Sequence, residues 1–203
     1  MNEKYPVRKR LRLKSYDYSQ NGCYFVTICS KDRRSVFGSI DIALGGKAEC
    51  LLSGLGLVLQ EQWLLLDNRF PGTCVLPFCI MPNHFHGVIT LPCKTWSEEV
   101  PQQEHTTDDG RQGQSPCPTL GDIVGSFKSV TTRLYNQSGG ARGITVWQSR
   151  YYDRIIRDEK EYLMICQYIE QNAAKWKEDR YHDANDLGIE DQLMVIAANE
   201  VYR

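Results

Sequence analysis

The sequence predicts an α+β protein with a ferredoxin-like fold, in which a split β-α-β order builds an antiparallel sheet with helices on one face. Short runs rich in Val, Ile, Thr and aromatic residues alternate with segments whose apolar residues recur at helical spacing. Their order along the chain is strand, helix, strand, strand, helix, strand. A further helix follows the last strand, near the C-terminus.

The first half of the chain supplies three of the expected strands. Residues 23–29 form the first one, bounded by Asn21-Gly22. The glycine-rich segment 35–56 is either a small hairpin or an irregular insert, and a helical apolar repeat overlaps its end over residues 55–66. Residues 74–80 form a strand whose proline indicates a sheet edge or a bulge. A brief link joins it to a strand over residues 84–91, so these two strands are expected to form a hairpin.

The second half supplies two helices and the last strand. Thr119 is a suitable N-cap for a helix that Gly139-Gly140 closes. Residues 151–156 form a strand, and Asp158 caps a helix whose apolar stripe extends to Trp176. The apolar residues of the first of these helices are Leu120, Ile123, Val124, Phe127, Val130 and Leu134.

Length and composition favour one domain, because 203 residues of which 41% are hydrophobic can bury one sizeable core. Residues 1–20 form a basic arm that mixes cations with tyrosines, and residues 21–176 form the domain. A polar, acidic segment at about 92–118 is expected to be a mobile insert. Residues 177–203 are a C-terminal extension to which the sequence assigns no role.

Cysteine spacing and hydropathy indicate the compartment. The eight cysteines include no Cys-x-x-Cys pair, so the usual structural zinc spacings are missing. The chain shows neither the apolar core of a signal peptide nor an apolar run of membrane-spanning length. We therefore expect a reduced, cytoplasmic protein with no membrane partner.

Two histidines stand at the start of the strand over residues 84–91. Side chains alternate between the faces of a strand, so His84 and His86 point the same way while Phe85 points into the opposite layer. Neutral imidazoles held by a rigid strand suit a divalent metal ion. A histidine on a strand is more often a structural, hydrogen-bonded residue, so a metal site also needs a further ligand and a target.

The late helix presents two polar side chains together. Tyr168 and Asn172 are four residues apart, so a phenol and an amide oxygen lie one above the other on one helical face. Tyr151, Tyr152 and Tyr162 are nearby alternatives for any role that Tyr168 has.

Three separated motifs, in this order, resemble the single-tyrosine transposases of the HUH nuclease superfamily. The resemblance is strongest to the REP-associated tyrosine transposases, and it extends from Tyr24 to Trp176. The motifs are Pro82-Asn83-His84-Phe85-His86, then Gly125-Ser126-Phe127-Lys128, then Trp147-Gln148 with Tyr151-Tyr152-Asp153 and Tyr168-Ile169-x-x-Asn172.

This resemblance implies a function for each matched residue. His84 and His86 would hold a divalent ion, Mg²⁺ or Mn²⁺, and Tyr168 on a C-terminal catalytic helix would be the nucleophile. Asn172 matches the position that completes the metal shell. This chain has Ala173 where the related branch usually has proline, and Gln171 stands beside Asn172, so either amide is a candidate ligand.

The activity implied is that of a single-stranded DNA endonuclease and strand transferase. Tyr168 would form a 5′-phosphotyrosine bond with DNA that is single-stranded or hairpinned, on the nucleoid, and the enzyme would work as a monomer or a homodimer. Cations and tyrosines suit phosphate contact and base stacking. The candidate DNA-binding residues are Lys9, Arg10, Arg12, Lys128, Arg133, Arg150 and Arg154.

Two other classes of protein compete with this interpretation. A ferredoxin-like sheet can be a non-catalytic module that binds single-stranded DNA or RNA, but the aromatic signature of RNA-recognition modules is absent. A phosphoesterase that uses two separated histidine motifs needs a second motif, which the chain lacks.

Overall fold

The computed structural model describes residues 22–42, 46–75, 77–91, 118–138 and 143–182. The expected arm at residues 1–20, nearly all of the insert at 92–118 and most of the extension at 177–203 lie outside these residues. The described elements are β1 (Gly22–Cys29), η1 (Lys31–Arg33), β2 (Gly38–Ile42), β3 (Ala48–Leu52), α1 (Gly54–Leu64), α2 (Leu66–Arg69), β4 (Phe78–Met81), β5 (His84–Leu91), α3 (Leu120–Gln137), β6 (Tyr152–Ile156), α4 (Glu159–Gln171) and η3 (Ala173–Glu178).

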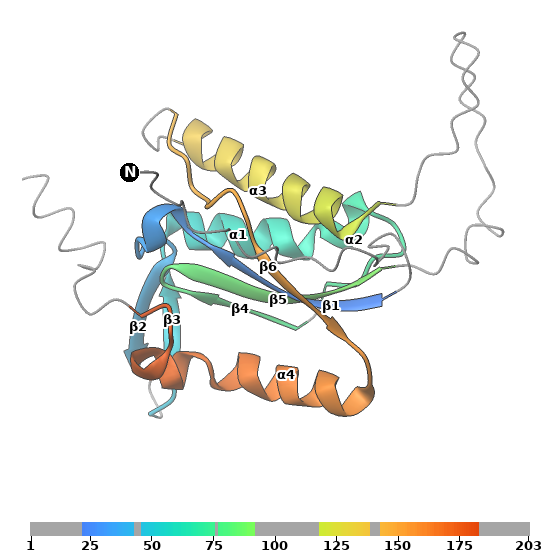
Figure 1. The fold of residues 1–203 in the computed structure, drawn as a ribbon. Coiled ribbons are helices and arrows are strands. Elements are labelled where there is room, and N and C mark those ends of the chain that lie inside the picture. The colour runs from blue at the N-terminus through green and yellow to red at the C-terminus, as the bar shows by residue number, and fades with distance from the viewer. Residues whose placement is uncertain (1–21, 43–45, 76, 92–117, 139–142, 183–203) are drawn as a thin grey trace, which may run out of the picture.

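Four strands form one antiparallel sheet in the order β4-β5-β1-β6. This order places the first and third strands of the split β-α-β unit at the centre, so the ferredoxin-like prediction is confirmed. Helices α1 and α3 cover one face of the sheet, and α4 lies across the other (Figure 1). Among the described residues, no helix is both long and apolar enough to cross a membrane.

Alternation along β1 and β5 sorts their side chains between two cores. Tyr24, Val26 and Phe85 pack under α1 and α3 in the larger core. Phe25 and Val88 point the other way and pack against α4 in a smaller core. A strand buried on both faces therefore sends alternate residues to different helices.

Gly87 shows how tightly the larger core meets β5. A Cβ atom at this position would lie 2.4 Å from the indole ring of Trp63. That ring is fully buried and lies beside Phe85, with 4.6 Å between the ring centroids. Glycine at position 87 thus lets a large aromatic side chain pack directly on the strand that carries the histidines.

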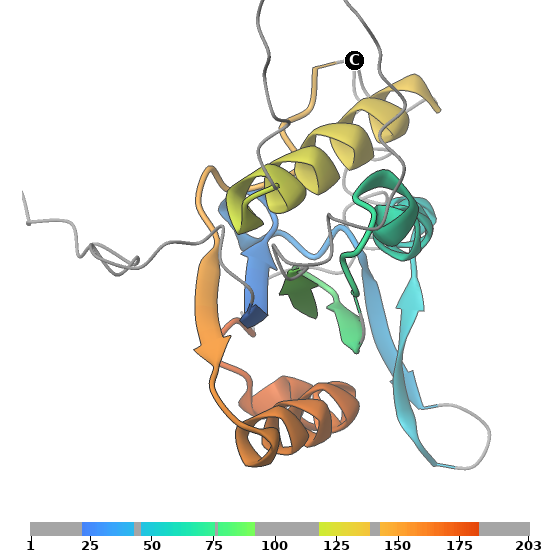
Figure 2. The same cartoon turned by 90° about the vertical axis from the view of Figure 1, so that its right-hand side faces the viewer.

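The glycine-rich segment after β1 forms a hairpin, the first of the two predicted alternatives. Its strands β2 and β3 pair separately from the main sheet. In Figure 2 this hairpin extends from the sheet toward the level of α4, and β3 contacts η3 beyond that helix.

Two predicted boundaries were wrong. The strand expected over 74–80 begins only at Phe78, with an isolated bridge between Cys74 and Thr90 before it. Pro77 has no N–H for a strand ladder, although its carbonyl still accepts from the Val88 amide at 2.9 Å. The helix expected to reach Trp176 ends at Gln171 and continues as the 3-10 helix η3. Residues i and i+3 share a side in both helix types, so an apolar stripe does not distinguish them.

Candidate active site

His84 and His86 lie on the face of β5 that meets α4, and both side chains are buried, with exposed fractions of 0% and 1%. Phe85 between them points into the opposite core. The centroids of the two imidazole rings are 4.5 Å apart. The strand therefore aims two ring systems at one region between the sheet and α4, as the alternation of side chains predicts.

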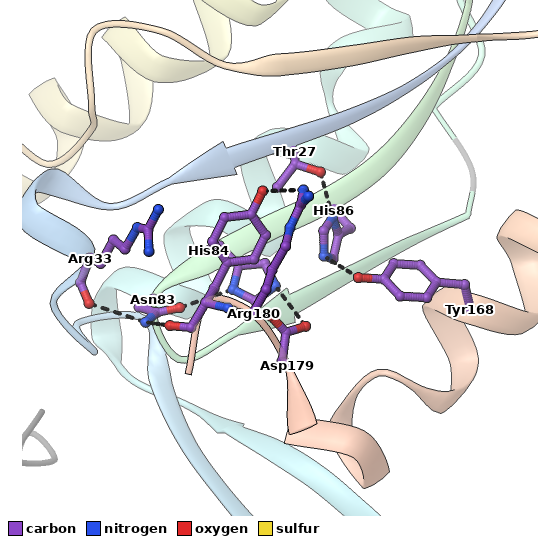
Figure 3. A network of polar contacts seen from close by, with 9 residues as sticks. Thr27, Arg33, Asn83, His84, His86, Tyr168, Asp179 and Arg180 are labelled. Atoms are coloured by element: carbon purple, nitrogen blue, oxygen red, sulfur yellow. Dashed lines mark hydrogen bonds and ion pairs between the residues drawn. The ribbon is translucent and has the colours of Figure 1, made fainter. Parts of the chain in front are cut away.

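Each ring nitrogen of His86 has a partner. Nδ1 is 2.8 Å from the Thr27 hydroxyl of the neighbouring strand β1, and Nε2 is 3.2 Å from the phenolic oxygen of Tyr168 on α4 (Figure 3). The Phe25 ring stacks on the imidazole at a centroid distance of 5.2 Å. His86 is thus oriented from three sides, and the Tyr168 side chain, 43% exposed, joins this buried group to the solvent.

Asn83 fixes the tautomer of His84. The amide nitrogen of Asn83 donates to the carbonyls of Arg33 and Tyr181, at 3.1 and 2.8 Å. Its oxygen must then be the atom that faces His84 Nδ1, at 2.9 Å. An amide oxygen only accepts, so Nδ1 carries the proton and Nε2 has a free lone pair. A hydrogen bond of this kind, made to the nitrogen that does not face the metal site, prepares an imidazole to bind a metal.

The free nitrogen of His84 faces a carboxylate. Nε2 has no hydrogen-bond partner among the described residues, and the carboxylate of Asp179 lies 3.9 Å away (Figure 3). One ligand atom each from His84, His86 and Asp179 lie within 4.8 Å of one another. Two imidazoles and one carboxylate around an unpartnered lone pair fit a divalent cation.

Burial keeps both imidazoles neutral. It lowers the pKa of His84 to about 3, helped by the positive charges of Arg180 and Arg33. Burial also lowers the pKa of His86 well below its usual value, and the neighbouring His84 acts in the same direction. Neutral imidazole is the form that binds metals.

Asp179 was not found by sequence reasoning, which ended the domain at residue 176. No motif marks this residue. It reaches His84 because the chain turns back at η3 after α4, and Trp176 and Tyr181 on either side of it pack near the His84 ring, at centroid distances of 5.9 and 4.7 Å. A sequence signal that marks the end of α4 at Gln171 would have been needed to predict this turn.

The two predicted amide ligands differ in position. Asn172 is buried and lies close enough to the Tyr168 phenol to favour its ionised form, yet neither of its amide atoms has a hydrogen-bond partner among the described residues. Gln171 accepts a hydrogen bond from Lys175 at 2.8 Å on the exposed side of the chain. Burial dominates the environment of Tyr168 itself and raises the pKa of its phenol.

The predicted DNA-binding residues are dispersed. Lys9, Arg10 and Arg12 lie outside the described residues. Arg154 is on the α4 side of the sheet but binds Glu161 at 2.6 Å, and Arg150 lines a cavity beside the histidines.

Lys128 and Arg133 lie on α3, across the sheet from the histidines (Figure 1). The Lys128 ammonium donates to the carbonyls of Gln148 and Ser149, at 2.7 and 3.1 Å. It therefore anchors the segment that leads to Arg150, and the structure does not bring it to the histidine pair.

Comparisons with known proteins agree with the resemblance seen in the motifs. No protein-family model matches the chain. A Haemophilus influenzae protein described as "Uncharacterized protein" is 35% identical over 86% of this chain and 93% of its own length. A second protein of that organism, described as "Putative REP-associated tyrosine transposase", is 23% identical over 78% of this chain and 74% of its own length.

A solved structure of a REP-associated tyrosine transposase bound to a REP hairpin aligns with 81% of this chain and 73% of its own, at 20% identity and a TM-score of 0.47. With 35% identity across 93% of the first relative, the chain belongs to the same family as that Haemophilus influenzae protein, and it resembles the REP-associated tyrosine transposases.

Proposed function

We propose that this protein is a metal-dependent endonuclease and strand transferase that acts on hairpin-bearing single-stranded DNA through a 5′-phosphotyrosine intermediate. The observation that carries the proposal is the 3.2 Å distance between the Tyr168 phenolic oxygen and His86 Nε2. A half-exposed phenol lies beside two buried, neutral imidazoles and near a carboxylate, which supports Tyr168 as the nucleophile. The sequence similarity to a REP-associated tyrosine transposase supports a transposase-like function in DNA processing.

Within this proposal, His84, His86 and Asp179 hold Mg²⁺ or Mn²⁺, with Asn172 as a further oxygen donor. A bound divalent ion polarises the scissile phosphate and neutralises charge that develops on its oxygens. Asn83 and Thr27 each hold one imidazole at its Nδ1 atom, and so would keep the two rings in position to bind the ion. The Tyr168 phenol stands at the solvent side of this cluster, where a DNA strand has access.

In the cleavage step the Tyr168 oxygen attacks phosphorus and loses its proton to the surroundings. The bond from phosphorus to the 3′-oxygen breaks, and that oxygen takes up a proton to become a free 3′-hydroxyl. The new 5′-phosphotyrosine ester keeps the energy of the broken diester, so the 3′-hydroxyl of another strand can reverse the step and join new ends. Tyr168 and His86 of the same chain are in contact, so the proposed step needs no second copy to bring the nucleophile to the histidines.

The substrate must be flexible at the bond that is cut. A regular duplex stacks its bases and fixes its backbone, whereas an unpaired strand bends into a site between a sheet and a helix at lower cost. The resemblance in the motifs points the same way, to imperfect hairpins with a short unpaired flank.

Covalent trapping tests the proposal. The full chain is incubated with Mn²⁺ and a labelled DNA hairpin that has unpaired ends, then denatured and separated on a gel. A labelled protein band is expected for the wild type and for Tyr162→Phe, a matched change on the same helix, and it is expected to vanish in Tyr168→Phe or with chelator. Binding of the hairpin by the wild type without any adduct would instead indicate a non-catalytic nucleic-acid-binding module.

A further inference from the structure

Beside the histidine pair lies a cavity of about 320 Å³ whose charged lining residues are all arginines, Arg33, Arg150 and Arg180. Among the described residues, none of these three guanidinium groups forms an ion pair with a carboxylate. Arg180 donates to the Tyr181 hydroxyl, and Arg33 and Arg180 both lie over the Tyr181 ring. The Asp179 carboxylate acts electrostatically on two lining residues, Cys29 and Tyr181, but the three guanidinium groups outnumber it. The cavity therefore carries an excess of positive charge, which is the electrostatic signature of an anion site.

The cavity shares two walls with the candidate active site. Thr27 lines the cavity and binds Nδ1 of His86 with its hydroxyl. Tyr181 lines it as well, and its ring centroid is 4.7 Å from that of His84. A group bound in the cavity is therefore separated from the histidines by a single layer of side chains.

Two fixed segments of the chain carry Arg33 and Arg150. Asp32 and Arg33 have left-handed backbone conformations, with φ of 57° and 58°. Non-glycine residues adopt these at a cost, and the surrounding structure must hold them. Asn83 does so by donating to the Arg33 carbonyl with the same amide group that orients His84.

On the other side, Lys128 holds the carbonyls of Gln148 and Ser149 directly before Arg150. Of these two supports, Asn83 is shared between the cavity wall and the active site.

Tyr152 adds an aromatic surface to this basic lining. The side chain is 37% exposed and lies on the strand next to Thr27, and the Arg180 guanidinium is 5.8 Å from its ring centroid. Arginines beside an accessible aromatic ring are the combination by which proteins bind a phosphate and stack the attached base. The cavity volume of about 320 Å³ is at the lower end of the range for small-molecule sites, which suits one nucleotide.

We infer that this cavity is the subsite for one unpaired nucleotide adjoining the bond that Tyr168 attacks: Arg33 and Arg150 bind its phosphate, Arg180 lies between this phosphate and the histidines, and Tyr152 stacks on its base. The inference rests on the proposed function and adds the part of the protein that selects an unpaired strand over a paired one. Because the cavity shares side chains with the surroundings of His84 and His86, the phosphate bound in the cavity and the phosphate that Tyr168 attacks are neighbours along one DNA strand.

The test compares two labelled hairpins, one with unpaired thymidine tails at both ends and one with blunt ends, bound to full-length protein that also carries Tyr168→Phe. Arg33→Gln with Arg150→Gln is expected to weaken binding of the tailed hairpin at least tenfold and to leave the blunt hairpin unchanged. The slope of log affinity against log salt should fall by about 0.7, the value for one lost contact to a single-strand phosphate. Arg157→Gln with Lys160→Gln makes the same charge change at exposed positions outside the cavity and should have no tail-dependent effect.

Tyr152 gives an independent readout of base stacking. Tyr152→Leu should weaken binding of the tailed hairpin roughly fivefold or more, and Tyr152→Phe should restore it, because stacking needs the ring and not the hydroxyl. Equal losses on both hairpins, or losses matched by the control pair, would overturn the subsite. The subsite would also be overturned if free thymidine monophosphate competed with the tailed hairpin no better than inorganic phosphate does, because the cavity would then bind any anion. A tail-dependent arginine effect, combined with no adduct when the protein with Tyr168 intact is trapped with Mn²⁺ and the hairpin, would reject the proposed function alone.

Discussion

The phenolic oxygen of Tyr168 lies 3.2 Å from Nε2 of His86, although the two residues are 82 positions apart in the chain. The contact exists because α4 crosses the face of the sheet that α1 and α3 leave open, and because alternation along β5 sends both histidines to that face.

Replacing the carboxylate nearest to His84 is expected to impair metal binding. Asp179→Asn should weaken Mn²⁺ binding at least tenfold by calorimetry, because a charged oxygen donor becomes a neutral one. Glu178→Gln removes the same charge from the preceding residue and should leave the affinity unchanged. If Asn172→Leu weakens binding and Asp179→Asn does not, the amide and not the carboxylate is the oxygen ligand.

Loss of the hydrogen bond that orients His86 is expected to act through the metal site. Thr27→Val keeps the shape of this buried side chain but removes the hydroxyl 2.8 Å from Nδ1. Mn²⁺ affinity and the rate of adduct formation should each fall about 10- to 100-fold, the usual effect of removing a residue that hydrogen-bonds to a metal-binding histidine. Thr132→Val on α3, whose hydroxyl donates to the Lys128 carbonyl of the same helix, is the matched change. Equal behaviour of the two variants would show that Thr27 has no orienting role.

Two glycine substitutions should change stability in opposite directions. Gly87→Ala would place a methyl group 2.4 Å from Trp63 and should lower the free energy of unfolding by about 1–3 kcal/mol. Gly125→Ala meets nothing within 4 Å in the interior of α3 and should raise it by about 0.5–1 kcal/mol. Urea denaturation measures both. A neutral result for Gly87→Ala would mean that the indole ring can withdraw from β5.

Acid should destabilise the metal-free protein through its buried histidines. Burial lowers the pKa of His84 to about 3, so between the ordinary value of about 6.5 and this value the unfolded chain binds a proton that the folded protein excludes. The free energy of unfolding therefore falls as the pH falls through this window, by about 1.4 kcal/mol per pH unit for this one group.

Urea denaturation at about pH 7 and about pH 5, with chelator present, measures the difference. The wild type should lose about 2 kcal/mol more than His84→Gln between these two conditions, since the variant lacks the titrating group. A wild type and a variant with the same pH dependence would show that His84 is protonated in the folded state.

The sequence alone determined the features that depend on local residue patterns: the order of strands and helices, the face on which a side chain lies, and where two helices begin. Alternating and helical apolar residues give the order of elements, and strand geometry puts His84 and His86 on one face. The Thr119 and Asp158 side chains start their helices as expected, each accepting from an amide three residues ahead. Tyr168 and Asn172 share a face because four residues make about one helical turn.

Only the tertiary structure decided what lies opposite these groups. Asp179 reaches His84 because α4 stops at Gln171 and η3 turns the chain back, an event that an apolar stripe does not record. Lys128 looks like a surface cation in the sequence, yet it binds two carbonyls of a segment 20 residues away. The arginine cavity joins side chains from three separate stretches of chain. Periodicity fixes the face on which a side chain lies, whereas its partner depends on how distant segments pack, and that information is spread over the whole core.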